Sequence, residues 1–438
     1  MSRTYQNIKG TFDILPEAST SDGTHVAASA SWHFVETAIR DVMCLYNFEE
    51  IRTPILEETE LVARGVGQLT DIVSKEMFAF ERGDTNYVLR PEITAPVMRA
   101  YLQHHLDQRG GVQKLFYIGP CFRAERPQKG RYRQFHQFGC EVIGSEDARA
   151  DVEVIALMLA IYERLHISRT ELRINTLGDA ISRAKHKDVL TNYFESHRGE
   201  LSETSLNRLE TNPLRILDTK DENERKLLAN APRLIDFIDD ESRRHYDEVK
   251  SLLVDLDIEY REDFFLVRGL DYYSRTAFEL ESPDLGAQNA LAGGGRYDLL
   301  SQELGSKRPV PAIGFAAGME RLFMALAAHD APIPEGRGVD IFMVALGDEA
   351  IRWTFQQAQH LRSEGFRVGF DLKGRSMKAQ MREANRQRAP LAVIVGRDEL
   401  ASGAAQLKDM VTGNQKAIPI GDLPDHLRSL EAAESIAD

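Results

Sequence analysis

Residues 114–144, KLFYIGPCFRAERPQKGRYRQFHQFGCEVIG, predict two strands joined by a long polar loop. From residue 123 to residue 133 this loop carries five basic residues against the single acid Glu125, a local net charge of +4. Side chains alternate between the two faces of a strand. The second strand therefore places two different sets of residues on its two faces: Arg133, Phe135, Gln137, Gly139 and Glu141 on one, and Gln134, His136, Phe138, Cys140 and Val142 on the other.

The first of these faces combines a cation, an aromatic ring, an amide and a carboxylate, a mixture that a buried sheet face would not use. It favours a site that binds a phosphorylated ligand with an aromatic ring. A solvated hairpin with a charged tip is the alternative that the pattern alone leaves open.

The whole-chain composition is that of an ordinary globular enzyme, with 438 residues, 28% charged residues and a formal net charge of −14. This length predicts two or three domains. Three cysteines without CxxC or His spacing indicate reduced thiols, no zinc site and a cytoplasmic location. No apolar run approaches the length needed to span a membrane, so no membrane partner is expected.

Charge is distributed unevenly along the chain. Residues 200–263 contain 18 acids and 10 basic residues in a helical pattern, which predicts an acidic helical insertion at about 180–258. Residues 362–388 contain 8 basic residues and 3 acids, a net charge of +5. Two separate basic regions on an acidic protein suggest two contact sites on one long phosphate-bearing polymer.

Local patterns predict several further elements. A helix is expected at 23–46, then a strand whose Pro54 indicates a sheet edge or an interface, and a hairpin formed by residues 77–80 and 85–90. Glu92 and Thr94 share one side if the chain there stays extended. A helix is expected at 147–166, capped by Ser145.

Three glycines, 293–295, precede Arg296 and Tyr297 and favour a wall that closely approaches a ligand, with a tight hairpin bend as the alternative. Residues 311–329 predict a strand followed by a helix with Arg321 in its first turn. A cation at that helix end is unfavourable unless an anion shares the site. Residues 330–338 resemble a linker, and a small α/β domain with a mixed sheet should follow.

Together these stretches resemble the class II aminoacyl-tRNA synthetases and, within them, the histidyl-tRNA synthetases. RTPILE at 52–57, FRAERPQKGRYRQFHQFGCEVIG at 122–144 and GFAAGMERL at 314–322 are similar to the three class motifs. RGLDYY at 268–273 and GGGRYD at 293–298 are similar to signatures of the histidyl branch, and LRPEIT at 89–94 also matches except at Ile93. The resemblance extends over nearly the whole chain.

This resemblance implies an α+β fold: an antiparallel class II sheet core at 1–335, interrupted by the helical insertion, and a C-terminal α/β anticodon-binding domain at 336–438. The implied reaction activates L-histidine with ATP and Mg²⁺ and transfers it to tRNA(His), in a homodimer. One alternative is a synthetase-like module that binds tRNA without charging it. The other is a non-catalytic relative, the regulatory subunit of ATP phosphoribosyltransferase. Such proteins usually lack the C-terminal domain and some of the motif residues.

The resemblance also implies a role for each site residue. ATP would contact Arg123, Glu125, Arg131, Phe135 and Arg321, with adenine between Phe135 and Arg321. Arg268 would be the catalytic arginine that joins the histidine carboxylate to the α-phosphate. Arg126 and Gln128 would contact the acceptor end of the tRNA. The histidine site would comprise Glu92, Thr94, Arg123, Gln137, Glu141, Arg268, Tyr272, Tyr273 and Tyr297.

Overall fold

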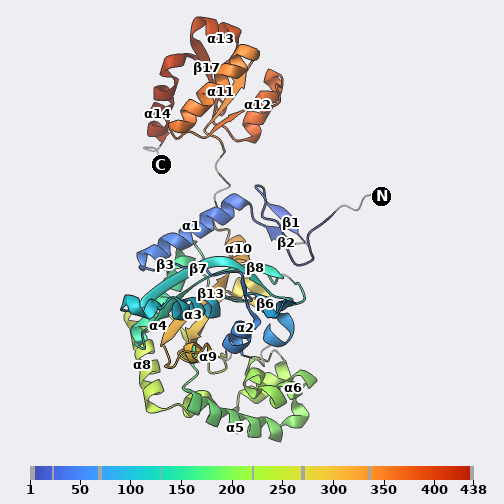
Figure 1. Cartoon of the computed structure of the whole chain (residues 1–438), viewed down its shortest axis with the longest axis vertical. Helices are drawn as coiled ribbons and strands as arrows, with labels where there is room; N and C mark the ends of the chain where they lie inside the picture. The colour runs from blue at the N-terminus through green and yellow to red at the C-terminus, as the bar shows by residue number, and fades with distance from the viewer. Residues whose placement is uncertain are drawn as a thin grey trace. The chain divides into compact units, whose positions relative to one another are not determined.

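An eight-stranded, largely antiparallel sheet forms the centre of the first of two units (Figure 1). The computed structural model describes residues 5–21, 24–67, 72–128, 130–219, 221–267, 272–333, 336 and 338–434. The sheet order is β10-β9-β11-β12-β13-β8-β7-β3, with parallel pairing only at its two outer strands β3 and β10. The strands are β3 Glu49–Glu50, β7 Gln113–Phe122, β8 Gln134–Ile143, β9 Glu171–Thr176, β10 Arg261–Glu262, β11 Ser274–Glu281, β12 Ala290–Arg296 and β13 Ala312–Gly318.

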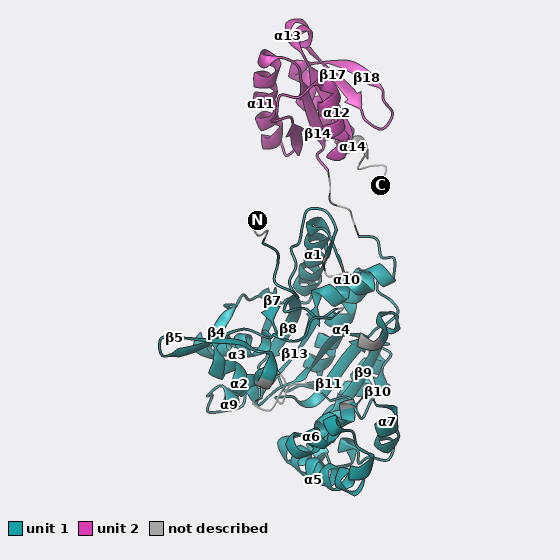
Figure 2. Cartoon of the chain, turned by 90° about the vertical axis from the view of Figure 1, so that its right-hand side faces the viewer, with its two compact units in different colours: residues 1–333 teal, residues 334–438 magenta. Residues whose placement is uncertain are grey.

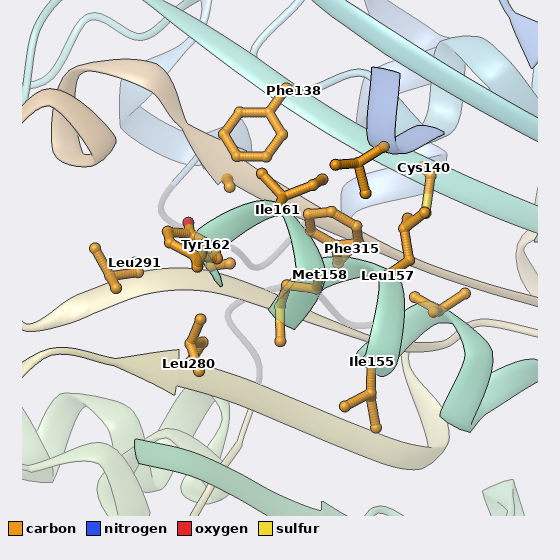
Figure 3. Packing of buried hydrophobic residues seen from close by; sticks show 14 of the residues in the cluster. Phe138, Cys140, Ile155, Leu157, Met158, Ile161, Tyr162, Leu280, Leu291 and Phe315 are labelled. Atoms are coloured by element: carbon orange, nitrogen blue, oxygen red, sulfur yellow. The ribbon is translucent and has the colours of Figure 1, made fainter. Parts of the chain in front are cut away.

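The main hydrophobic core lies between this sheet and the helices that supply its other residues. Phe138 and Cys140 of β8 face helix α4 there, as the strand alternation predicted (Figure 3). The contributing helices are α1 Ser29–Leu45, α4 Ala148–Arg164, α8 Asp240–Asp255 and α10 Met319–Ala328. Because this face of β8 is committed to the core, its other face is available for the site.

The opposite face of the sheet carries the side chains of the site and helix α3, Thr94–Gln103. A three-stranded sheet of order β4-β6-β5 lies nearby in sequence, and its β5–β6 hairpin confirms the hairpin predicted there. The remaining elements of this part are β1 Ser19–Ser21, β2 Thr24–Val26, β4 Leu56–Glu58, α2 Thr59–Val66, η1 Ile72–Glu76, β5 Phe78–Arg82, β6 Thr85–Leu89, η2 Leu106–Arg109, η6 Pro283–Gln288 and α9 Leu300–Glu303.

The acidic segment forms a helical lobe between β9 and β10, as its charge and pattern predicted (Figure 2). Its own core contains Leu190, Phe194 and Ile216. Its elements are α5 Ala180–Ser196, η3 Arg198–Glu200, α6 Glu203–Thr211, η4 Pro213–Asp218, α7 Glu222–Leu228 and η5 Leu234–Asp236, and helix α8 follows.

The chain divides into residues 1–333 and 334–438 (Figure 2). The second unit has a mixed five-stranded sheet of order β15-β14-β16-β17-β18, which confirms the predicted α/β tail. Its elements are β14 Ile341–Ala345, α11 Asp348–Ser363, β15 Val368–Phe370, α12 Met377–Arg386, β16 Leu391–Val395, α13 Arg397–Ser402, β17 Ala404–Asp409, β18 Gln415–Pro419, η7 Ile420–Asp422 and α14 Leu423–Glu434.

Two predictions about the N-terminal half were wrong. The first helix begins at Ser29 rather than residue 23, because Thr24–Val26 pairs with Ser19–Ser21 as a hairpin. No continuous strand runs through Pro54. The guanidinium of Arg90 donates to the Thr53 carbonyl at 2.8 Å. This carbonyl therefore bonds to a side chain and not to the backbone of a neighbouring strand.

Two further predictions located the right segment but gave the wrong local structure. Helix α4 is capped by Asp147, whose carboxylate accepts from the Arg149 N–H at 2.9 Å, and not by Ser145. Glu92 and Thr94 lie together although the chain there is not extended, because α3 begins at Thr94 and Glu92 binds its first N–H groups.

Candidate active site

A cavity of about 420 Å³ opens on the site face of the large sheet. Its size suits a small-molecule substrate site. Most of the residues predicted to bind ligands line it: Glu92, Thr94, Arg123, Glu125, Arg131, Phe135, Gln137, Tyr272, Tyr273 and Arg321. They come from four separate regions of sequence, which the sheet brings together.

One part of the cavity is cationic and aromatic. The Arg123 guanidinium lies over the Phe135 ring, 5.2 Å from its centroid, and its Nε donates to the Pro91 carbonyl at 3.1 Å. Arg131 donates to Glu125 at 3.1 Å across the hairpin loop. A flat ring flanked by guanidinium groups is chemically suited to a nucleotide, because rings stack on aromatic and guanidinium planes and phosphates accept from guanidinium forks.

Arg321 lies in the first turn of α10, as predicted, and donates to the Ala290 carbonyl at 2.9 Å. Burial and the neighbouring Arg131 lower the pKa of its guanidinium. A lowered pKa means that the positive charge is disfavoured there. A bound polyanion would relieve this electrostatic cost.

Glu320, the residue before Arg321, was not predicted as a site residue. Its carboxylate accepts from the His136 backbone N–H at 2.9 and 3.1 Å, and one of its oxygens lies 3.0 Å from His136 Nδ1. This contact fastens α10 to β8 beside Phe135. Glu320 thereby fixes the relative positions of the two elements that carry Phe135 and Arg321.

The other part of the cavity is polar and acidic. Both oxygens of Glu92 bind the start of α3, accepting from the N–H of Thr94 at 2.6 Å and of Ala95 at 3.0 Å. Burial raises the pKa of Glu92, and these N–H groups and Arg123 partly oppose the rise. A cationic ammonium beside Glu92 would stabilise its ionised form.

Glu141 is buried just behind this wall and is surrounded by hydroxyl groups. Its carboxylate accepts from Tyr297 at 2.5 Å, from Thr94 at 2.7 Å and from Tyr117 at 3.1 Å. Burial raises its pKa to about 8, although the Tyr297 and Thr94 bonds act to lower it. These three donors come from β7, α3 and the end of β12, and they hold the carboxylate in one orientation.

Glu141 and Tyr297 do not line the cavity, unlike the other described residues predicted for the amino-acid site. Tyr297, which was expected to line the same pocket, is 1% exposed, and its hydroxyl donates to Glu141. Tyr272, which lines the cavity, contacts Tyr297, with ring centroids 5.7 Å apart.

The glycine run contributes to the wall and also to the packing of the sheet. Gly293 lines the cavity. A Cβ on Gly294 would lie 2.2 Å from the Gly314 carbonyl oxygen, so close strand packing also requires glycine. Arg296 does not face the ligand. It is completely buried on the opposite side, where it pairs with Asp151 at 2.6 Å.

Arg126 and Gln128, predicted to contact tRNA, do not line the cavity. Both are exposed on the loop between β7 and β8, where they are accessible to a large partner. Arg268 lies outside the described residues, so its catalytic role remains a prediction from resemblance.

Sequence reasoning missed Tyr117, Glu320 and Arg215. The sequence gives Tyr117 the pattern of an ordinary core residue in a buried strand. Only its hydrogen bond to Glu141 connects it to the site. The signal for it was Gly139, directly opposite in the ladder, because a Cβ there would lie 2.7 Å from the Tyr117 hydroxyl. Arg215 belongs to the helical insertion and lines the cavity from a distant part of the sequence.

Among the described residues, no three His, Cys, Asp or Glu side chains are arranged to hold a metal ion. Mg²⁺ in phosphate-transfer sites needs only one or two carboxylates, with phosphate oxygens and water completing its shell. Glu279 on β11 lines the cavity and can supply one such ligand. No helix in the described part of the chain is long and apolar enough to cross a membrane.

Comparison with known proteins gives matches over nearly the whole chain. The family model described as histidyl-tRNA synthetase matches residues 26–322, and one described as anticodon binding domain matches residues 340–430. A histidine–tRNA ligase of Chloroherpeton thalassium is 48% identical over 424 residues, covering 96% of each chain. One of Chlorobium luteolum is 46% identical over 435 residues, covering 99% of each.

Solved structures give the same result. Apo histidyl-tRNA synthetase of S. aureus aligns with a TM-score of 0.80 and 36% identity, over 97% of this chain and 100% of that one. A Bacillus halodurans protein described as an ATP phosphoribosyltransferase regulatory subunit/histidyl-tRNA synthetase aligns with a TM-score of 0.61 over 90% of this chain and 99% of that one. At 23% identity, that second match shows a shared fold alone.

Proposed function

The chain belongs to the histidyl-tRNA synthetase family and is a histidine–tRNA ligase, and from this premise we propose which of its residues perform the reaction. The family implies ATP, histidine and tRNA as substrates. The observation that carries the proposal is the division of one cavity into a cationic, aromatic part and a carboxylate- and tyrosine-rich part. An enzyme that joins a nucleotide phosphate to an amino acid needs both parts side by side.

ATP binds in the cationic part, with its adenine between Phe135 and Arg321. Arg123 and Arg131 bind its phosphates, and Glu125 contacts the edge of the base. Phe135 already stacks against one guanidinium, which supports its use as an aromatic platform. Mg²⁺ would be held by the phosphates and Glu279, and it would neutralise phosphate charge when bound.

Histidine binds in the acidic part, with its ammonium near Glu92, Thr94 and Gln137. Its imidazole meets one tyrosine of the Tyr272–Tyr273 pair and Glu141, which Thr94, Tyr117 and Tyr297 orient. A pocket that pairs both ring nitrogens rejects amino acids that lack them, since its buried polar groups would be left unpaired.

The chemical step brings two anions together. Arg268 would bridge the histidine carboxylate and the α-phosphate, while Arg123 stabilises charge on the phosphate. The carboxylate attacks phosphorus directly and pyrophosphate leaves. The terminal ribose hydroxyl of tRNA(His) then attacks the adenylate carbonyl, so that the ester to tRNA forms, the bond from the carbonyl carbon to the phosphate oxygen breaks and AMP leaves. Arg126 and Gln128 contact the acceptor end, and the basic residues 362–388 contact the anticodon region.

Dimerisation and a cytoplasmic location belong to the same proposal. The first class motif, 52–57, lies next to short edge strands and lines a surface hollow, which supports its use as a contact between two copies. All three cysteines are free, as expected in a reducing compartment.

Histidine-dependent exchange of pyrophosphate into ATP tests the assigned chemistry directly. The folded protein should catalyse exchange with histidine and not with other amino acids. A folded protein without exchange would instead agree with a non-catalytic regulatory subunit, an alternative that the intact Arg123, Gln137, Glu141 and Arg321 make less favourable.

A further inference from the structure

Arg215 connects the helical insertion to the substrate cavity. It lies on η4, within the lobe formed by α5, α6 and α7 beside the β9–β10 edge of the sheet (Figure 2). Its side chain nevertheless lines the same cavity as Arg123 and Tyr273. The insertion is therefore part of the wall of the site.

The turn that carries Arg215 is fixed by its own contacts. Pro213 begins it, and the Arg215 N–H donates to the Asn212 carbonyl at 3.0 Å. The Arg208 guanidinium donates to the Arg215 carbonyl, also at 3.0 Å. Ile216, the next residue, is completely buried in the core of the insertion. This anchored backbone limits where the Arg215 side chain can reach.

The lobe is also attached to the sheet at the edge of the cavity. The Arg183 side chain on α5 donates to the backbone carbonyl of Tyr273. Arg183 and Arg215 both line a second, smaller cavity that includes Tyr273 and Asn175. The insertion thus meets the sheet where the tyrosine pair enters β11.

Arg215 joins three other arginines in the lining of this cavity: Arg123, Arg131 and Arg321. Five glutamates also line it, and one of them, Glu125, pairs with Arg131. Guanidinium groups are the side chains best suited to bidentate contact with phosphate oxygens. We propose that Arg215 binds a phosphate group of a substrate in this cavity, so that the insertion takes part directly in substrate binding.

This inference rests on the proposed function, because the phosphate is either that of ATP and the adenylate or that of the tRNA end. The two sources share their chemistry but enter at different steps. Pyrophosphate exchange requires ATP but no tRNA, whereas charging requires ATP and tRNA. Comparing the two reactions therefore shows whether the phosphate belongs to ATP or to tRNA.

The test compares Arg215→Ala and Arg215→Lys with Arg225→Ala in the full-length protein. Arg225 is an exposed arginine of the same lobe that does not line the cavity, so its substitution controls for loss of charge alone. Arg215→Ala should lower kcat/KM for ATP in exchange by roughly tenfold or more, the scale of one lost charged hydrogen bond. Arg215→Lys should restore part of the loss, while Arg225→Ala remains near wild type.

Normal exchange combined with reduced kcat/KM for tRNA also supports phosphate binding, and assigns the phosphate to the tRNA. Normal kinetics in both reactions would overturn the proposal. A higher KM for histidine with unchanged kinetics for ATP and tRNA would also overturn it, because Arg215 would then only support Tyr273. Melting temperatures identify misfolded variants. If Arg215→Ala does not fold, the kinetics of Arg215→Lys, which keeps most of the side-chain volume, test the proposal instead. Absence of exchange in the wild type would count against the proposed function instead.

Discussion

The Tyr297 hydroxyl donates a hydrogen bond of 2.5 Å to Glu141, and both side chains are buried behind the cavity wall. Glu141 receives two further hydroxyl bonds, from Thr94 and Tyr117. A buried carboxyl group that is held in one orientation in this way can form a hydrogen bond with an imidazole without contacting bulk water. The proposed selectivity for histidine thus depends in part on Glu141, Tyr117 and Tyr297, which do not themselves line the cavity.

Removing one of these hydroxyls should weaken histidine binding selectively. Tyr297→Phe should raise the KM for histidine by roughly tenfold, the scale of one lost hydrogen bond, and leave the KM for ATP unchanged. Pyrophosphate exchange measures both. Tyr162→Phe is a matched control, because Tyr162 is equally buried and its hydroxyl has no hydrogen-bond partner among the described residues. An equal rise in both KM values would show a general distortion instead.

The same carboxyl should make stability depend on pH. Burial raises the pKa of Glu141 from 4.5 to about 8. Between these values the folded protein binds more protons at this site than the unfolded chain does, so this contribution to stability falls as pH rises. Glu141→Gln cannot ionise and should lose less stability than wild type from pH 5 to pH 8. Thermal melting across that range checks the difference, and parallel curves would contradict it.

The sequence predicted the parts of the site where the alternation of a strand or the repeat of a helix determines the direction of the side chains. The alternation along β8 correctly separated Phe135 and Gln137 from the core residues Phe138 and Cys140. The strand-to-helix pattern likewise placed Arg321 in the first turn of α10.

Contacts between distant segments could not be predicted in this way. The sequence around Tyr117 is that of an ordinary buried strand, and the sequence around Arg215 is that of a solvated helical lobe. The glycine run was expected to form a ligand wall, but the direction of the Arg296 side chain after it could not be predicted, because a one-residue step along β12 reverses the direction of a side chain. Its buried partner Asp151, 145 residues earlier in the chain, determines its orientation.

The Asp151–Arg296 pair should be important for stability. Asp151 also binds His245 at 2.7 Å and Thr276 at 2.6 Å. Burial alone would raise its pKa, but Arg296 and His245 outweigh burial and lower it. Asp151→Asn removes the closer of the two carboxylates that Arg296 contacts and leaves only Asp298, at 3.3 Å. It should reduce the free energy of unfolding by up to about 3–5 kcal/mol, measured with urea.

An exposed ion pair in the same unit supplies the comparison for Asp151. Glu195 binds Arg198 at 2.9 Å with both side chains nearly half exposed. Glu195→Gln should therefore change the free energy of unfolding by less than about 1 kcal/mol. Similar losses in the two variants would mean that burial does not determine the cost.

The basic segment of the second unit should act on tRNA and not on amino-acid activation. Several of its arginines already bind groups of their own unit, including Arg375 with Asp371 and Arg386 with Glu383. Lys378 and Arg382, by contrast, are exposed on α12.

Reversing these two exposed charges separates the two steps of the reaction. The double variant Lys378→Glu, Arg382→Glu should raise the KM for tRNA and make it less sensitive to salt, by about one unit of log–log slope for each phosphate that the variant no longer binds. Pyrophosphate exchange should remain at the wild-type rate, because the substrates of activation bind in the other unit. Lys416→Glu, an exposed reversal on β18, controls for net charge and should have a smaller effect. An equal loss of exchange and charging would show that the basic segment supports amino-acid activation. An unchanged KM for tRNA would mean that Lys378 and Arg382 do not bind tRNA.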